Sequence, residues 1–311
     1  MKRLGFAAAA LALAGCGGGG SHGLGPGDVR QLEQLAVGRA GGQVLTVAWS
    51  PNGKRIAAGG PNGIVIVDPQ SGRSHLLLHT ATQVWGVAWD RDGTKLAAAT
   101  EDGKVWISPL HVYQPGRNVA PAFSVDWSPD GKLAIGYGGG TVRAIARDGN
   151  DHTYTSHTAE VIAVAWSHAG DRLASGSIDA TVRIGDGHRE RFGEPSGADV
   201  NGVAWSPDDE KLAAANQDGI VRVWDVGDRK IVLRLRGHEG WTRGVAWSPN
   251  GKLLLTSGAD GTARLWDAES GKELRSVKAG ASEAWAVAWS PDGQRFATGD
   301  GDGSVRIWGV R

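Results

Sequence analysis

The sequence predicts an all-β protein built from one repeated sheet, and three observations support this fold class. Of its 311 residues, 49 are glycine, about twice the usual share, which indicates many turns. Tryptophan is the preferred aromatic residue, with 14 Trp against 4 Phe and 3 Tyr. A segment close to Val-Ala-Trp-Ser-Pro recurs seven times, and its tryptophans are Trp49, Trp89, Trp127, Trp166, Trp205, Trp247 and Trp289. Their spacing of 38 to 42 residues is typical of units that stack to share one core.

Each repeat contains three short strands joined by two tight turns, and one further extended segment follows. In the last copy, Trp289 is followed by a turn at Asp292-Gly293, a second turn at Asp302-Gly303 and an alternating strand over 305–308. Asp-Gly and Asn-Gly between short alternating runs predict β-hairpins, because both turn residues can adopt positive φ. The further segment is residues 231–235 in the fifth copy and 273–277 in the sixth. Four antiparallel strands per repeat predict a β-propeller blade, and seven copies predict seven blades.

The two ends of the repeat region predict how the ring closes. The last repeat ends at Arg311 after its third strand. Residues 31–37 precede the first repeat as a strand that has no blade of its own. Pairing this strand with the last blade would complete that blade and remove an exposed sheet edge. We therefore expect a propeller over residues 31–311, closed by its N-terminal strand.

The N-terminal residues predict a targeting segment. Met1-Lys2-Arg3 precedes an apolar run over 4–14, which is too short to cross a bilayer core of about 30 Å. A basic start and a short apolar run are typical of a secretory signal over residues 1–15. Leu13-Ala14-Gly15-Cys16 resembles a bacterial lipobox, which implies cleavage before Cys16 and lipidation of this single cysteine. An ordinary secretory signal and a misassigned start codon are the alternatives.

Residues 16–30 are expected to be the lipidated cysteine and a Gly-rich tether that is flexible through Gly27. This predicts a cell-envelope protein that is attached to the membrane by its lipid anchor only. Gly17 stands where an Asp would resemble an inner-membrane retention signal, so an outer-membrane destination is favoured. Without lipidation, the protein would be periplasmic or secreted.

Composition and motif content argue against several function classes. The 33 basic and 33 acidic side chains give a net charge of zero, which argues against nucleic-acid binding. A single Cys excludes an internal disulfide and a Cys-rich metal site. The sequence has no Gly-x-Ser-x-Gly elbow and no phosphate-binding loop. Residues 148–151 and 300–303 resemble parts of calcium loops but lack the closing Glu. We expect no catalytic residues, no metal and no cofactor.

The repeats resemble the WD-repeat family of β-propellers over residues 31–311. The sixth copy has the fullest pattern, with Gly237-His238, Trp247, Asp260-Gly261 and Trp266-Asp267. The resemblance implies a structural hydrogen-bond chain in this copy, formed by His238, Thr256, Asp260 and Trp266. The fourth copy keeps the set His157, Ser175 and Asp179 and has Gly185 in place of the Trp. Such a set could suggest a catalytic triad, but its recurrence in partial copies favours a structural role.

The resemblance also places partner contacts on the rim where the innermost strands begin. Residues four and six positions before each repeated Trp vary between copies, unlike the core positions. The predicted partner-binding residues are Trp85, Phe123, Glu160, Asp199, Asn201, Trp241, Arg243, Glu283 and Trp285. Aromatic residues and an Arg, rimmed by acids, are typical of a protein-interface hot spot. The alternative is that these tryptophans plug the mouth of the central channel.

The sequence therefore predicts a non-enzymatic scaffold, a monomeric ring that binds a protein or peptide in the cell envelope. One alternative is a propeller enzyme, which would need converging acids, histidines or metal ligands on the rim, where no His occurs among the predicted residues. A second alternative is a periplasmic translocation component that resembles the Tol–Pal propeller. That family has an α/β domain before its propeller, for which residues 1–30 are too short.

Overall fold

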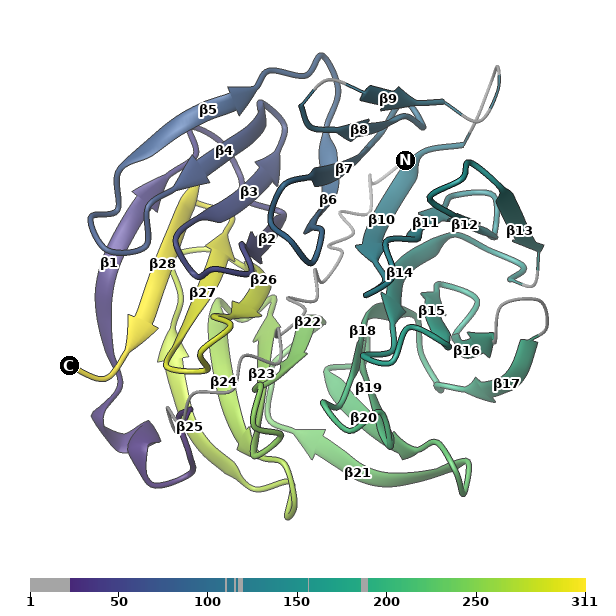
Figure 1. Ribbon diagram of the computed structural model, residues 1–311. Helices are drawn as coiled ribbons and strands as arrows, with labels where there is room; N and C mark the ends of the chain where they lie inside the picture. Colours follow the sequence, from purple (N-terminus) through teal and green to yellow (C-terminus); the bar gives the residue numbers. More distant parts are fainter. Residues whose placement is uncertain (1–22, 110, 115, 117–119, 156, 186–189) are drawn as a thin grey trace.

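Seven four-stranded antiparallel sheets surround a central axis in the computed structural model (Figure 1). The structure describes residues 23–109, 111–114, 116, 120–155, 157–185 and 190–311. The predicted seven-bladed β-propeller is confirmed. The predicted signal peptide and Cys16 lie outside the described residues. Within the described ranges, no helix is long and apolar enough to cross a membrane.

The blades follow one another in chain order, and each contributes strands at four successive distances from the axis. The innermost strands are β2 (Thr46–Trp49), β6 (Val84–Trp89), β10 (Ala122–Trp127), β14 (Val161–Trp166), β18 (Val200–Trp205), β22 (Thr242–Trp247) and β26 (Ala284–Trp289). The second strands are β3 (Ile56–Gly60), β7 (Leu96–Thr100), β11 (Leu133–Tyr137), β15 (Leu173–Ser177), β19 (Lys211–Asn216), β23 (Leu253–Gly258) and β27 (Arg295–Asp300). The third strands are β4 (Gly63–Val67), β8 (Val105–Ile107), β12 (Thr141–Ile145), β16 (Thr181–Gly185), β20 (Ile220–Asp225), β24 (Thr262–Asp267) and β28 (Ser304–Gly309). The outermost strands are β5 (Ser74–Leu78), β9 (His111–Tyr113), β13 (Asp151–Thr155), β17 (Glu190–Pro195), β21 (Lys230–Arg236), β25 (Glu273–Lys278) and β1 (Glu33–Arg39).

Blade 7 takes its outermost strand from the other end of the chain. Strand β1 pairs antiparallel with β28, with Val37 opposite Arg306 and Glu33 opposite Gly309. Figure 1 shows β1 in purple beside β28 in yellow. The predicted closure is therefore confirmed, because the last blade of the chain is completed by its N-terminal strand.

The repeated tryptophans hold neighbouring blades together. The Trp205 side chain is fully buried, and its indole Nε1 donates a hydrogen bond to the carbonyl oxygen of Ala165 in the preceding blade at 3.0 Å. Trp49, Trp89 and Trp247 make the same bond to the alanine that precedes the Trp of the blade before. The small alanine lets the two sheets approach, and the indole fills the space between them. These tryptophans are core residues, as the sequence predicts.

A cation from one blade covers the tryptophan of the next blade at several of these interfaces. Arg172 lies 4.7 Å above the ring of Trp205, and Arg295 lies 5.1 Å above the ring of Trp49. Both arginines stand six residues after the Trp of their own blade. Blade 6 has the fully buried Leu253 at this position. This position therefore supplies no cation to stack on Trp289 of blade 7.

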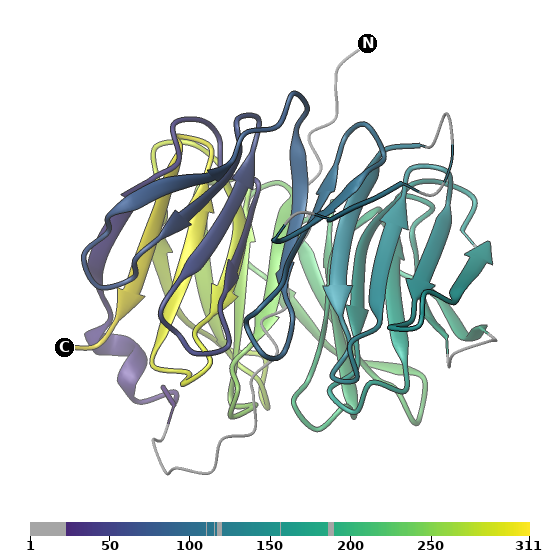
Figure 2. The ribbon, with the colours of Figure 1, turned by 45° about the horizontal axis from the view of Figure 1, so that its top comes forward.

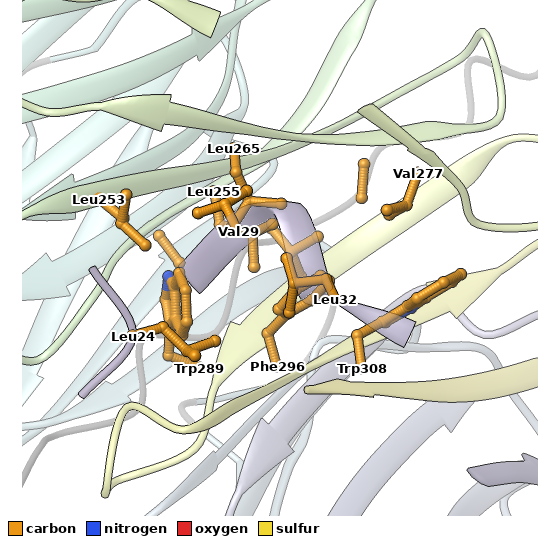
Figure 3. Packing of buried hydrophobic residues seen from close by; sticks show 13 residues of the cluster. Leu24, Val29, Leu32, Leu253, Leu255, Leu265, Val277, Trp289, Phe296 and Trp308 are labelled. Carbon is orange, nitrogen blue, oxygen red and sulfur yellow. The ribbon is translucent and has the colours of Figure 1, made fainter. Parts of the chain in front are cut away.

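An N-terminal clip, residues 23–32, covers this apolar interface between blades 6 and 7. It contains the short 3-10 helix η1 (Asp28–Gln31). Figure 3 shows Leu24 beside Trp289, and Leu32 near Phe296 and Trp308. The Leu24 amide donates to the carbonyl oxygen of Gly293 at 2.9 Å. The structure therefore differs from the expected flexible tether through Gly27, because the clip has three apolar side chains to bury, those of Leu24, Val29 and Leu32.

The two faces of the ring differ in what they carry. We call the face where the innermost strands begin the mouth face, and the opposite face the turn face. The clip bonds to Gly293 and Asn250, which lie in turns that follow innermost strands, so it lies on the turn face. Figure 2 shows η1 at the lower edge of the ring.

Candidate functional site

Seven residues at one repeat position form a ring at the mouth face, which we call the mouth ring. Each lies four positions before a repeated Trp, at the start of an innermost strand. They are Leu45, Trp85, Phe123, Ile162, Asn201, Arg243 and Trp285. All seven are buried, and the five apolar members belong to one hydrophobic cluster that joins blades 1, 2, 3, 4 and 7. Because one cluster unites these blades, the mouth-ring side chains point toward one another around the axis.

The predicted aromatic residues of the rim are thus largely covered. Trp85 is 8%, Phe123 7% and Trp285 7% exposed. Trp85 and Phe123 pack edge to face, with 5.7 Å between ring centroids. This packing favours the interpretation of these three residues as a plug of the mouth, while their role in partner binding stays a prediction.

Arg243 is a buried cation held between two indoles. Its guanidinium carbon lies 4.6 Å from the Trp241 ring centroid and 4.0 Å from that of Trp285. Its Nη2 forms an ion pair with Glu283 at 2.5 Å. Burial lowers the pKa of Arg243, and the charge of Glu283 opposes this effect. The structure therefore brings together four of the predicted site residues, from blades 6 and 7, in one contact network.

Four of the other predicted rim residues stand two positions before the mouth-ring residue of their own blade. Glu160, Asp199, Trp241 and Glu283 stand six positions before a repeated Trp and are partly exposed. Burial raises the pKa of Asp199, and its own backbone N–H partly offsets the effect. Asn201 is fully buried, and its Nδ2 donates to the carbonyl oxygen of Thr242 at 2.8 Å. The accessible part of the predicted site is therefore acidic, with Trp241 as its partly exposed aromatic residue.

The four predicted residues of blade 6 form a continuous hydrogen-bond chain. Trp266 Nε1 donates to Thr256 Oγ1 at 2.9 Å, and Thr256 Oγ1 lies 2.8 Å from His238 Nε2. His238 Nδ1 contacts both carboxylate oxygens of Asp260 at 3.1 Å. Burial alone would raise the pKa of Asp260, but hydrogen bonds from His238 and Thr262 outweigh it and hold the pKa below its ordinary value. All four polar side chains are used within the blade, as a structural role requires.

Blade 4 repeats most of this chain. His157 Nε2 lies 2.8 Å from Ser175 Oγ, and His157 Nδ1 lies 2.9 Å from Asp179 Oδ2. Burial opposes the effect, but hydrogen bonds from Thr181 and the Thr158 amide and the nearby His157 lower the pKa of Asp179 to about 2. Two equivalent blades thus place the same residues in the same geometry.

Blade 7 has an ion pair between Asp300 and Arg306 in the place where blade 6 has its histidine. Gly280 stands at the position of His238, and Asp300 stands at the position of Gly258. A Cβ on Gly258 would lie 2.4 Å from His238 Nδ1, so a side chain and the histidine cannot share this space. In blade 7, Asp300 fills it and pairs with Arg306. Burial raises the pKa of Asp300 to about 7, although Arg306 opposes the shift.

The two aspartates that resembled part of a calcium loop bind this arginine. Asp302 Oδ2 lies 2.7 Å from Arg306 Nη2, and Asp300 pairs with Nη1 of the same guanidinium. Hydrogen bonds from Arg306 lower the pKa of Asp302 to about 2. No cluster of three or more His, Cys, Asp or Glu in the described part of the chain has the geometry to hold a metal ion.

Two features were not predicted from the sequence, namely Glu239 on the mouth face and the clip on the turn face. Glu239 is exposed and lies two residues before the predicted rim residue Trp241. This proximity in the sequence was the only indication that Glu239 belongs to the rim. The clip was also missed, and its signal was Leu253, which stands where five of the other six copies have Lys or Arg.

Blade number, strand order and the hydrogen-bond chain define the molecule as a repeat β-propeller, with a full His-Thr-Asp-Trp chain in blade 6 and a partial one in blade 4. The family model "WD domain, G-beta repeat" matches residues 32–67, 73–107, 150–186, 188–225, 229–267 and 271–309. The chain therefore belongs to the WD-repeat family. Propellers of this family commonly bind proteins or peptides. A comparison with curated proteins gave no significant match.

Proposed function

We propose that this protein is a non-enzymatic scaffold that binds a protein or peptide at its mouth face and is held to the cell envelope by a lipid on Cys16. One observation carries the binding proposal. At the core positions of the repeat, packing dictates Trp and Ala, whereas the partly exposed rim positions differ from blade to blade and include Glu160, Asp199 and Trp241. Such variation on an otherwise regular ring supports a surface whose residues are set by a partner.

The position of the clip fits a membrane anchor at Cys16. Six residues lie between Cys16 and Gly23, the start of the clip, and the seven steps from one to the other span at most about 25 Å. A lipid on Cys16 would therefore keep the turn face near the bilayer. The mouth face, on the opposite side of the ring, would then point away from the membrane and be open to a partner.

Binding at the mouth face is tested by affinity capture from a detergent-solubilised envelope. The rim variant carries Gln83→Ala, Asp199→Ala and Trp241→Ala, which are all partly exposed in the structure. A matched control changes three exposed residues of the turn face by Lys54→Ala, Asp92→Ala and Asp228→Ala. We expect the wild type and the control to retain the same partner and the rim variant to lose it.

Melting temperatures of the three proteins complete this experiment. The exposed side chains of the control should each alter stability by only about 0.5 kcal/mol, whereas Trp241→Ala also removes an indole from the buried Arg243 and should lower the melting temperature of the rim variant further. Equal partner recovery by the rim variant and the control would contradict the proposal.

A further inference from the structure

Acidic side chains gather on the mouth face over blades 4 to 7. Glu160, Asp199 and Glu283 occupy the same repeat position in blades 4, 5 and 7. Trp241 holds that position in blade 6, and the exposed Glu239 lies two residues before it. These four acids therefore lie on consecutive blades at one end of the axis, in a chain whose net charge is zero.

Several arginines near this acidic group are already paired with carboxylates. Arg222 pairs with Asp218, Arg264 with Asp260, and Arg306 with Asp302, in each case between a turn and the strand after it. Arg243 pairs with Glu283, which belongs to the acidic group itself. Arg236 and Lys278 are exposed at the ends of β21 and β25 on the same face, and neither pairs with a carboxylate in the described part of the chain. Within the described ranges, Glu160, Asp199 and Glu239 form no ion pair with any cationic side chain. Their charges therefore add to a negative potential at the mouth face.

The mouth ring beneath these acids contains polar atoms without a partner. Asn201 is fully buried, and its Oδ1 accepts no hydrogen bond from the described residues. The indole Nε1 groups of Trp85 and Trp285 likewise donate none to the part of the chain that the structure describes. Buried polar groups are normally hydrogen-bonded, so these three atoms are groups that a ligand bound at the mouth would satisfy. A ligand with N–H donors would suit Asn201, which lies two residues after Asp199.

We propose that the mouth face over blades 4 to 7 binds a lysine- or arginine-rich segment of a protein partner. This inference rests on the proposed function and adds the charge class of the partner. A basic segment would supply the counter-charges that Glu160, Asp199 and Glu239 lack. Its ammonium or guanidinium groups can also stack on Trp241, which is partly exposed among these acids.

The test uses a short fluorescent peptide of alternating lysine and glycine as the probe, and a glutamate-glycine peptide of equal length as its counterpart. The acid-neutral variant carries Glu160→Gln, Asp199→Asn and Glu239→Gln. A control variant removes the same charge from exposed residues of the turn face by Asp92→Asn, Asp228→Asn and Glu269→Gln. Fluorescence anisotropy gives Kd for each protein at low and at physiological salt.

We expect the lysine peptide to bind the wild type and the control equally, and the acid-neutral variant about tenfold more weakly. Higher salt should weaken the wild-type complex, because exposed charges are screened beyond about 8 Å at physiological salt. Equal Kd values for the acid-neutral and control variants would overturn the inference, as would tighter binding of the glutamate peptide or no binding of the lysine peptide. If the capture experiment still shows a partner that depends on the rim, then only the charge class has failed.

Discussion

A chain that begins at Ala40 is expected to lose cooperative folding altogether. This truncation removes both the clip and strand β1, so β28 becomes an edge strand and Trp308 loses its cover. The ring then lacks the strand that joins its two ends, and the loss approaches the whole stability of a typical domain, about 5–15 kcal/mol. Thermal unfolding followed by circular dichroism measures the effect.

Two further truncations separate the parts played by the clip and the strand. A chain that begins at Gly23 keeps both and should unfold at the temperature of the longer chain. A chain that begins at Glu33 loses the burial of Leu24, Val29 and Leu32, each of which contributes at most about 1.5–3 kcal/mol, so it should remain folded but melt earlier. If the chains that begin at Ala40 and Gly23 melted at the same temperature, β1 would not close the ring.

Replacement of Asp126 by alanine is expected to change how stability depends on pH. Asp126 stands where the other six copies have Ala before the repeated Trp, and it is 1% exposed. Its Oδ2 accepts a hydrogen bond from the Trp166 amide at 2.7 Å, and no cation pairs with it in the described part of the chain. Burial raises its pKa to about 8, although hydrogen bonds from the Trp166 and Trp127 amides oppose the shift.

The sign of the pH effect follows from this raised pKa. Between pH 4 and pH 8 the folded protein holds a proton on Asp126 that the unfolded chain has released, so the free energy of unfolding falls as the pH rises. Four pH units correspond to a loss on the order of 5 kcal/mol at most. Alanine removes this loss but also removes the acceptor of the Trp166 amide, at a cost of about 1 kcal/mol at every pH.

Asp126→Ala should therefore be slightly less stable than the wild type near pH 4 and clearly more stable near pH 8. Denaturant unfolding at several pH values measures the two curves. Asp300 keeps its own raised pKa in both proteins, so the difference between the curves isolates Asp126. A difference that stays constant from pH 4 to pH 8 would contradict the assignment of a buried, unpaired carboxyl.

The repeat pattern predicts the fold because each copy repeats the same local information. Asp-Gly and Asn-Gly turns fix the hairpins, and the Trp with its neighbouring Ala fixes how blades pack, so seven copies determine both strand order and closure. The clip could not be predicted in this way, because residues 23–31 occur once and their glycines are typical of a linker. Its docking site exists because Leu253 replaces a cation, and this matters only once blades 6 and 7 are in contact.

The candidate site was predicted only in part, for a similar physical reason. Repeat positions place Trp85, Phe123 and Trp285 at the mouth, but whether they are exposed depends on how seven side chains from different blades pack around the axis. The stacking of Arg243 between Trp241 and Trp285 likewise depends on contact between blades 6 and 7. The acidic residues remain accessible because they precede the buried mouth-ring residues by two positions, before the innermost strands begin.

Ring closure by β1 is tested most directly by a disulfide across the two ends of the chain. Val37 and Arg306 are paired residues on β1 and β28, so a protein with Cys16→Ser, Val37→Cys and Arg306→Cys should form an internal disulfide on oxidation. The matched control places the second cysteine at Arg222, which lies at the equivalent position of blade 5 and pairs with Asp218 as Arg306 pairs with Asp302. Mass spectrometry of the oxidised proteins should show the cross-link with Arg306→Cys and none with Arg222→Cys. Equal cross-linking of the two proteins, or none with Arg306→Cys, would contradict a ring closed by its N-terminal strand.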